Sequence, residues 1–93
     1  MRLHNLHVAK KVQRKMLVKH GITHEEAQRA FRETFKQGLR KGRVVVRGKD
    51  PDSGKYIVIV GDVKKGVLYA ATCQPMDKRE KALYKRGLKK RQG

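Results

Sequence analysis

The stretch KHGITHEEAQRAF, residues 19–31, predicts the junction of two helices. Gly21 is the residue type best able to adopt the left-handed conformation that ends a helix, and Ile22 offers the apolar contact that often accompanies this cap. Thr23 and Glu26 have the spacing of a capping box, in which each side chain accepts a hydrogen bond from the other residue's backbone N–H. The stretch therefore predicts a tight helical hairpin.

Amphipathic patterns extend from this junction in both directions. Apolar residues recur at helical spacing from Val8 to Lys19, and basic residues fill the opposite side of this first helix. The second helix carries its own apolar stripe and is expected to end near Gly38, where a basic loop at residues 39–42 follows. We therefore expect both helices to bury one face and the first to present a basic face to solvent.

Beyond residue 42, helical spacing gives way to runs of β-branched residues. Three of these runs predict strands at Arg43–Lys49, Tyr56–Gly61 and Val67–Cys73. Turn-forming residues at 50–54 and a short connection at 63–66 separate the strands, which should therefore form an antiparallel meander. The second run is continuously apolar at its centre, as expected for a middle strand covered on both faces.

A last helix is expected after Pro75, where Asp77 and Glu80 have the spacing of a second capping box. The predicted class is α+β: a helical hairpin packed on a three-stranded antiparallel meander, followed by a C-terminal helix. An extra edge strand within residues 1–6 is an open alternative. The 93 residues suffice for a single domain, 1–93, whose residues 88–93 are expected to form a frayed basic tail.

Charge is the strongest indication of function. The chain has 25 Lys and Arg residues against eight Asp and Glu residues, a formal net charge of +17. Such an excess repels itself in the compact state, and a polyanion is its natural neutraliser. We therefore expect RNA, free or within a ribosome, as the partner. So few acids also leave no carboxylate pair for hydrolysis.

Several other classes of site are not indicated. Cys73 is the only cysteine, which fits a reducing compartment, and the cytoplasm is the expected location. No apolar run approaches the roughly 18–20 residues of a membrane span, so no membrane association is expected. The four His residues lack partners at ligand spacing, so no metal or other cofactor is expected. GKDPDSGK, residues 48–55, fits neither a phosphate-binding Walker loop nor an EF-hand and predicts a turn.

Alternation along the strands predicts one basic sheet face. Val44 and Val46 should point to the buried side, whereas Arg47 and its alternating neighbours point away from it. Tyr69 on the third strand would stand among these cations, as in proteins that stack bases of single-stranded RNA. The alternative is an ordinary solvated face with Tyr69 packed under the last helix. The expected RNA-binding residues are Arg43, Lys55, Tyr69, Gln74 and Lys78.

The succession of KHG, EEA and Phe within residues 19–31 resembles the signature of BrnT-type toxins, which are ribonuclease components of bacterial toxin–antitoxin pairs with a RelE-like fold. The end of the chain is also similar, because a strand is followed by Glu80 and, four residues later, Tyr84. The likeness covers most of the chain. Two features depart from the family: residues 1–7 replace its aromatic-acidic opening, and Gln74 stands where the family has Arg.

The resemblance implies a metal-independent endoribonuclease, in which the RNA 2′-hydroxyl attacks the neighbouring phosphate. Arg47, Lys49 and Arg79 would stabilise the developing negative charge, and Tyr84 would act as a polar assistant. The resemblance also implies an acidic antitoxin protein as a partner. Two alternatives remain: a non-catalytic RNA- or ribosome-binding module, for which the basic face suffices, and a DNA-binding hairpin, which the acidic residues of the second helix disfavour.

Overall fold

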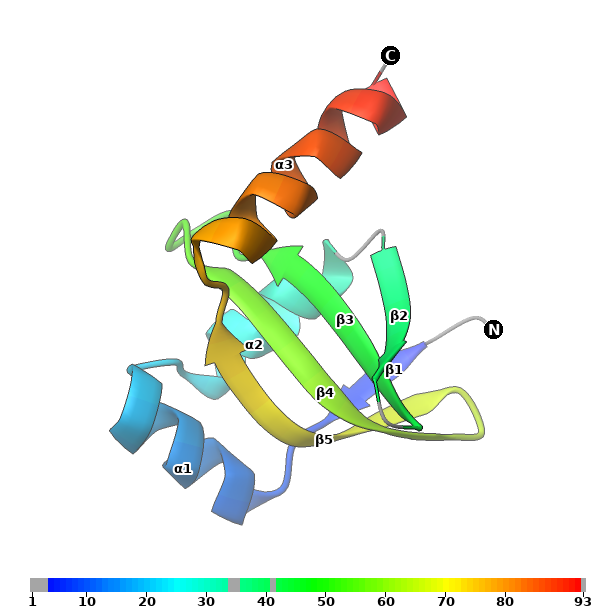
Figure 1. The fold of residues 1–93 in the computed structure, drawn as a ribbon. Coiled ribbons are helices and arrows are strands. Elements are labelled where there is room, and N and C mark those ends of the chain that lie inside the picture. Colours follow the sequence, from blue (N-terminus) through cyan, green and yellow to red (C-terminus); the bar gives the residue numbers. More distant parts are fainter. Residues whose placement is uncertain (1–3, 34–35, 41, 93) are drawn as a thin grey trace.

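The structure, a computed structural model, describes residues 4–33, 36–40 and 42–92 (Figure 1). Its elements follow one another as β1 (Asn5–His7), α1 (Lys10–His20), α2 (His24–Arg32), β2 (Lys36–Arg40), β3 (Arg43–Lys49), β4 (Tyr56–Lys64), β5 (Val67–Pro75) and α3 (Lys78–Gln92). The described residues thus contain three helices and one five-stranded sheet, and the predicted α+β class is confirmed.

The strands form a mixed sheet in the order β1-β5-β4-β3-β2. β3, β4 and β5 make the predicted antiparallel meander, with β4 in the middle. β1 lies at one edge and runs parallel to β5, where Asn5 is opposite Val67 and His7 is opposite Tyr69. The alternative of an edge strand within residues 1–6 is therefore correct for residues 5–6, and the strand extends one residue further, to His7. Residues 1–3 lie outside the described part of the chain.

The sequence predicts a core of three strands, and β2, at the other edge of the sheet, is a strand that this prediction omits. The sequence predicts a helix end and a loop over residues 36–42, but α2 ends at Arg32, and residues 36–40 pair with β3. Lys, Gln and Leu in this segment are good helix formers. Without β2, however, the outer edge of β3 would leave a row of backbone donors and acceptors unpaired. Strand pairing therefore outweighs local helix propensity here.

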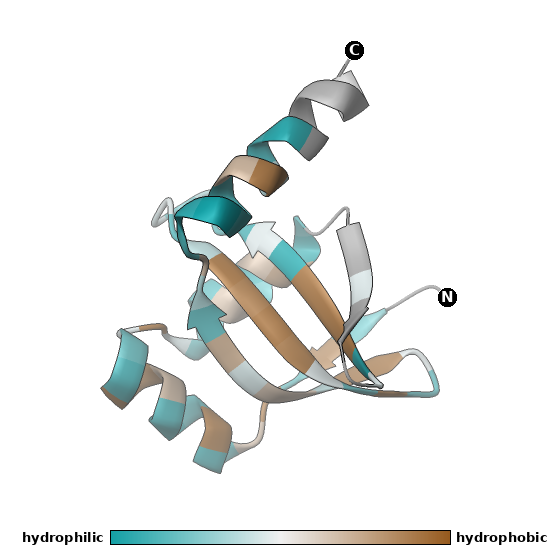
Figure 2. Cartoon of the chain, in the orientation of Figure 1, coloured by the Kyte–Doolittle hydropathy of each residue, from teal (hydrophilic) through white to brown (hydrophobic). Residues whose placement is uncertain are grey.

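Both faces of the sheet are covered, each by different helices. α1 and α2 pack on one face, where Met16 and Ile22 meet Ile59 in the larger core. α3 packs on the other face, where Tyr84 joins Val58 in a smaller core. Figure 2 shows the apolar band of β3 and β4 that both cores share. β4 is thus covered on both sides, as its apolar run predicts.

The helix ends follow their local sequence closely. Gly21 adopts φ 67° and its N–H reaches back to the carbonyl of Leu17, as predicted for the end of α1. The capping box of Thr23 and Glu26 is complete. At α3 only half of the predicted box forms: Asp77 Oδ1 accepts from the Glu80 N–H at 2.8 Å. The α3 helix continues to residue 92, so the segment expected to fray from residue 88 is helical up to that point.

A β-bulge interrupts the pairing of β4 and β5. Val60 is opposite Thr72 and Gly61 is opposite Ala70, which leaves Ala71 as an extra residue in β5. The extra residue shifts the alternation, so that both Thr72 and Tyr69 lie on the α3 side of the sheet although they are three positions apart. A Cβ atom at Gly61 would collide with the Tyr69 carbonyl oxygen and lie 2.8 Å from its carbonyl carbon.

We therefore predict that Gly61→Ala lowers the free energy of unfolding by about 2 kcal/mol or more, because backbone atoms must move to admit the methyl group. Gly38→Ala is the matched control, since nothing lies within 4 Å of a Cβ atom there. Urea unfolding of both variants would test this. Equal midpoints for the two variants would contradict the close approach of the strands.

Candidate nucleic-acid interface

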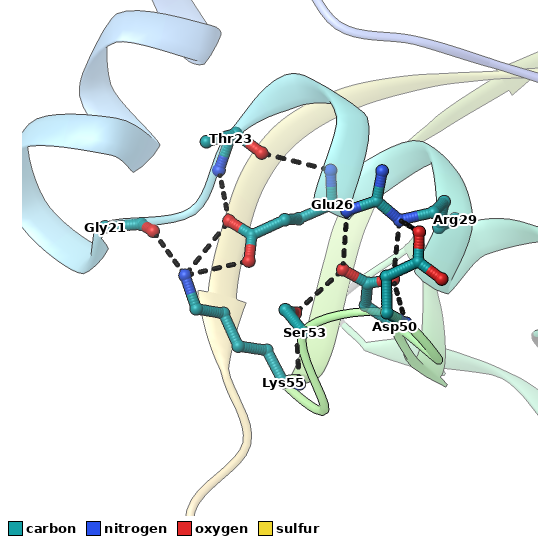
Figure 3. A network of polar contacts seen from close by, with 8 residues as sticks. Gly21, Thr23, Glu26, Arg29, Asp50, Ser53 and Lys55 are labelled. Carbon is teal, nitrogen blue, oxygen red and sulfur yellow. Dashed lines mark hydrogen bonds and ion pairs between the residues drawn. The ribbon is translucent and has the colours of Figure 1, made fainter.

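A buried ion pair fixes the β3–β4 loop to α2 (Figure 3). The Asp50 side chain is 0% exposed, and Arg29 donates to it from Nε to Oδ1 at 2.7 Å and from Nη2 to Oδ2 at 3.0 Å. The Ser53 hydroxyl and the Asp52 backbone N–H donate to the same carboxylate at 2.7 and 3.0 Å. These four donors compensate the desolvation of the charge. The segment at residues 48–55 is thus a structural turn.

A second ion pair joins the same loop to the helical hairpin. The Lys55 ammonium lies 2.9 Å from Glu26 Oε2 and donates to the carbonyl oxygen of Gly21 at 2.7 Å. Glu26 Oε1 also accepts from the Thr23 N–H at 2.9 Å. Lys55 was expected to contact RNA from the loop, but its ammonium group is engaged within the protein. The structure therefore gives it a bracing role.

Both carboxylates are held in their charged form. Burial alone would raise the pKa of Glu26, but the hydrogen bonds from Lys55 and from Thr23 outweigh burial and lower the pKa to about 2. The hydrogen bonds from Arg29 hold the pKa of Asp50 well below its usual range, again against the effect of burial. Each carboxylate therefore stabilises the fold only while it is ionised.

Two further ion pairs engage predicted site residues on β3. Arg47 lies 3.2 Å from Glu80 of α3, and their side chains are only 20% and 16% exposed. Arg43 lies 3.8 Å from Asp62, and this pair is exposed. Arg47 was expected to stabilise charge on a reacting phosphate, but Glu80 already neutralises it. Its present role is to fasten α3 to the sheet.

Most of the acidic residues therefore form ion pairs with cations of the same chain. Five of the eight acids form ion pairs in the described part of the chain, and they engage four of the 25 Lys and Arg residues. The exposed cations of α1 and α3 are not among those four. They are Lys10, Lys11, Arg14, Lys15, Lys19, Lys78, Arg79, Lys81, Lys85 and Arg86. The net positive charge thus resides mainly on two helices.

A groove of about 170 Å³ runs between α1 and β5. Lys15, Lys19 and His20 line its helical side, whereas Thr72 and Gln74 line its strand side. Its remaining walls include Cys73, whose burial raises the pKa of the thiol to about 12, so the thiol stays protonated and unreactive at neutral pH. The groove combines cations with neutral hydrogen-bonding groups, and it contains no acidic residue.

A second cavity of about 360 Å³ lies beside the first, and His20 lines both. It lies between the end of α1, the β3–β4 loop and the start of α3, and its walls include Tyr56 and Lys81. We call the two cavities together the basic track. It is lined by Lys15, Lys19, His20, Lys55, Tyr56, Thr72, Gln74 and Lys81.

Three of the four predicted catalytic residues lie where α3 crosses β3 and β4, but they do not form one open site. They are Arg47, Lys49 and Tyr84. The Lys49 ammonium lies 5.3 Å from the centre of the Tyr56 ring. The Tyr84 ring packs edge-on against the same ring at 5.8 Å and is only 3% exposed, so it is a core residue. Arg79 is exposed on the first turn of α3.

The predicted RNA-binding residues are similarly dispersed. Gln74 lies in the groove and Lys78 is exposed on the first turn of α3. Tyr69 is 44% exposed, and its ring lies 5.4 Å from that of His7 at the β1 side of the sheet. It is therefore not packed under α3. Of the predicted set, only Gln74 and Lys55 line the basic track.

Sequence reasoning missed the cations of α1 and α3 that line the track. The four-residue spacing of Lys15 and Lys19 places both on one side of a helix. That spacing does not reveal that this side faces the edge of β5. The gathering of Lys81 and Tyr56 also depends on the crossing of α3 over the sheet, for which the sequence carries no local signal.

Among the described residues, no three or more His, Cys, Asp or Glu side chains are placed to hold a metal ion. In the same residues, no helix has the length and apolar character needed to cross a membrane. No protein-family model matches the chain, and no curated protein matches its sequence. Function is therefore inferred from geometry and charge.

The pairing of Glu26 leads to a prediction about pH. Its folded pKa lies below its ordinary value of 4.5, so its stabilisation is present above pH 4.5 and is lost as the pH falls toward about 2. At pH 7, Glu26→Gln should lower the free energy of unfolding by about 3 kcal/mol. The difference from wild type should shrink as the pH falls through this window.

The adjacent exposed residue offers the control, because Glu25→Gln removes the same charge without breaking the pair with Lys55. We expect a change within about 0.5 kcal/mol for that variant. Chemical denaturation at pH 7, 4 and 3 is the measurement. Equal losses for both variants, or a constant difference at all three pH values, would show that the Lys55 contact adds no stability.

Proposed function

We propose that the protein binds RNA along the basic track. One observation supports this most: Lys15, Lys19 and His20 line a groove whose other wall offers Thr72 and Gln74, while most acids are engaged in internal contacts. Cations attract the phosphates, and the polar groups along this stretch of β5 can bind sugar hydroxyls or base edges. A purely structural surface has no need of unpaired cations gathered at a groove.

The shape of the track favours a single strand over a duplex. Its two cavities, of about 170 and 360 Å³, are small and share His20 as a lining residue. A duplex presents its phosphates on a wide convex surface, whereas an unpaired strand can enter a groove with its backbone and bases. The outer face of α2 carries Glu25, which disfavours docking of that helix against any nucleic acid.

Charge reversal within α1 tests the proposal. Lys15→Glu with Lys19→Glu should weaken binding of a single-stranded RNA roughly tenfold or more, because two phosphate contacts become repulsive. Wild-type affinity should also fall steeply with salt, with a slope of about −0.7 per contacted phosphate in a plot of log K against log salt concentration. Fluorescence anisotropy at several salt concentrations measures both quantities.

Lys10→Glu with Arg14→Glu is the matched control, since it changes the same charge at the same spacing in the same helix. Lys10 and Arg14 line a different hollow, toward His24. This variant should lose affinity only through long-range electrostatics, at most about threefold. Equal loss in both double variants, with circular dichroism showing folded protein, would mean that RNA binds by overall charge and not in the groove.

A second candidate function is RNA cleavage. The arrangement that supports it is the position of His20 and Gln74 on the two walls of the groove, beside Lys19. His20 could take the proton of the RNA 2′-hydroxyl as that oxygen bonds to the adjacent phosphorus, and return it to the 5′-oxygen as the bond between phosphorus and the 5′-oxygen breaks, while Lys19 would stabilise the negative charge. This assignment differs from the one that the family resemblance implies, because Tyr84 is buried and Arg47 is paired.

Incubation of labelled RNA in chelator separates cleavage from binding. If the groove is catalytic, His20→Ala should abolish fragment formation while leaving affinity within a few-fold of wild type. Gln74→Arg should raise the rate roughly tenfold, because it adds one charge-assisted contact to the transition state. If wild type and Gln74→Arg both match a protein-free blank, with and without ribosomes, the protein is a binding module without nuclease activity.

A further inference from the structure

We infer that the protein carries a site for a terminal phosphate group of RNA, built around Tyr56. The ammonium groups of Lys49, Lys81 and Lys85 lie 5.3, 5.6 and 5.5 Å from the centre of this one ring. We call these four residues the lysine cage. The inference rests on the proposed RNA binding and names the group that would anchor the RNA.

Three separate elements assemble the cage. Lys49 ends β3 and is the cross-strand partner of Tyr56, which begins β4, while Lys81 and Lys85 lie one turn apart on α3. A ring has only two faces, so at least two of the three ammonium groups lie over the same face. Each cation gains from the ring electrons, while the like charges gathered around one ring repel each other.

The protein itself offers no anion to relieve this repulsion. Glu80 is the adjacent acid on α3, but it lies 3.2 Å from Arg47 and is largely buried in that pair. In the part of the chain that the structure describes, no acid lies within ion-pair distance of the three cage lysines. An external anion would bring the cage close to neutrality, and Lys81 and Tyr56 open it to the larger cavity of the track.

The charge of the cage selects among anions. A phosphate monoester carries about −1.5 to −2 charges at neutral pH and has three acceptor oxygens, whereas a phosphodiester carries a single charge. The ammonium donors that share one face of the ring therefore match a monoester better than a backbone diester. Tyr56 and Lys81 of the cage also line the larger cavity of the track, so a strand lying there could bring a terminal phosphate to the cage.

The test compares one RNA sequence in three forms: with a 5′-phosphate, with a 3′-phosphate, and with hydroxyl groups at both ends. One phosphorylated form should bind wild type roughly tenfold more tightly than the hydroxyl form. Lys85→Gln should reduce this ratio to about one, because Lys85 belongs to the cage but not to the lining of the track. Lys64→Gln, at the far end of β4, should leave the ratio unchanged.

The outcomes separate the two proposals. If all three RNA forms bind wild type equally, the cage has no role at an RNA end, while RNA binding itself stands. If none of them binds, both proposals fail. If inorganic phosphate binds in a Lys85-dependent way but neither RNA phosphate adds affinity, the cage serves a small phosphorylated molecule, and its assignment to RNA is overturned. The assignment to RNA would also be overturned if Lys85→Gln and Lys64→Gln showed the same ratio of affinities for phosphorylated and hydroxyl-ended RNA.

Discussion

The pairing of Arg29 with Asp50 is the constraint on which the rest of the structure depends. A fully buried carboxylate is tolerated only when its hydrogen bonds are satisfied, and here α2 and the β3–β4 loop both supply donors. The pair therefore holds the helical hairpin at a fixed position over the sheet. The neighbouring contact between Lys55 and Glu26 extends this bracing to the end of α1. The end of α1 is where the two cavities of the basic track meet, so these internal ion pairs position the proposed interface.

The same contacts explain how a chain with a net charge of +17 can expose cations selectively. The largely buried acidic residues form ion pairs that connect one secondary-structure element to another. They lie at the helix junction, in the β3–β4 loop, and between β3 and α3. Each of them neutralises a cation that would otherwise weaken the fold. Among the described side chains, the exposed cations of α1 and α3 form none of these ion pairs. Stability and the proposed RNA binding would thus depend on different subsets of the basic residues.

The sequence predicts the local features of this protein well and the tertiary ones poorly. The helix junction at Gly21 and Thr23, and the meander of β3, β4 and β5, follow from caps and β-branched runs that act over a few residues. β2 was missed because its stabilisation comes from pairing with β3, against its own propensity. Lys55 was assigned to RNA because its acidic partner, Glu26, is 29 positions away in sequence. Tyr84 was expected, from the family resemblance, to assist catalysis, because helical spacing does not show that α3 buries it against the second sheet face.

The parallel pairing of β1 with β5 has a consequence for how the chain folds during synthesis. Asn5 pairs with Val67, and about two thirds of the chain separates them. The helical hairpin and the β3–β4 hairpin can form as soon as their own residues leave the ribosome, since their contacts are local. β1 must wait until β5 has emerged, and Leu6, which is buried in the larger core, stays exposed until then. Closure of the β1 edge is therefore expected to be a late step, and the interval before it is when the nascent chain is most exposed to misassociation.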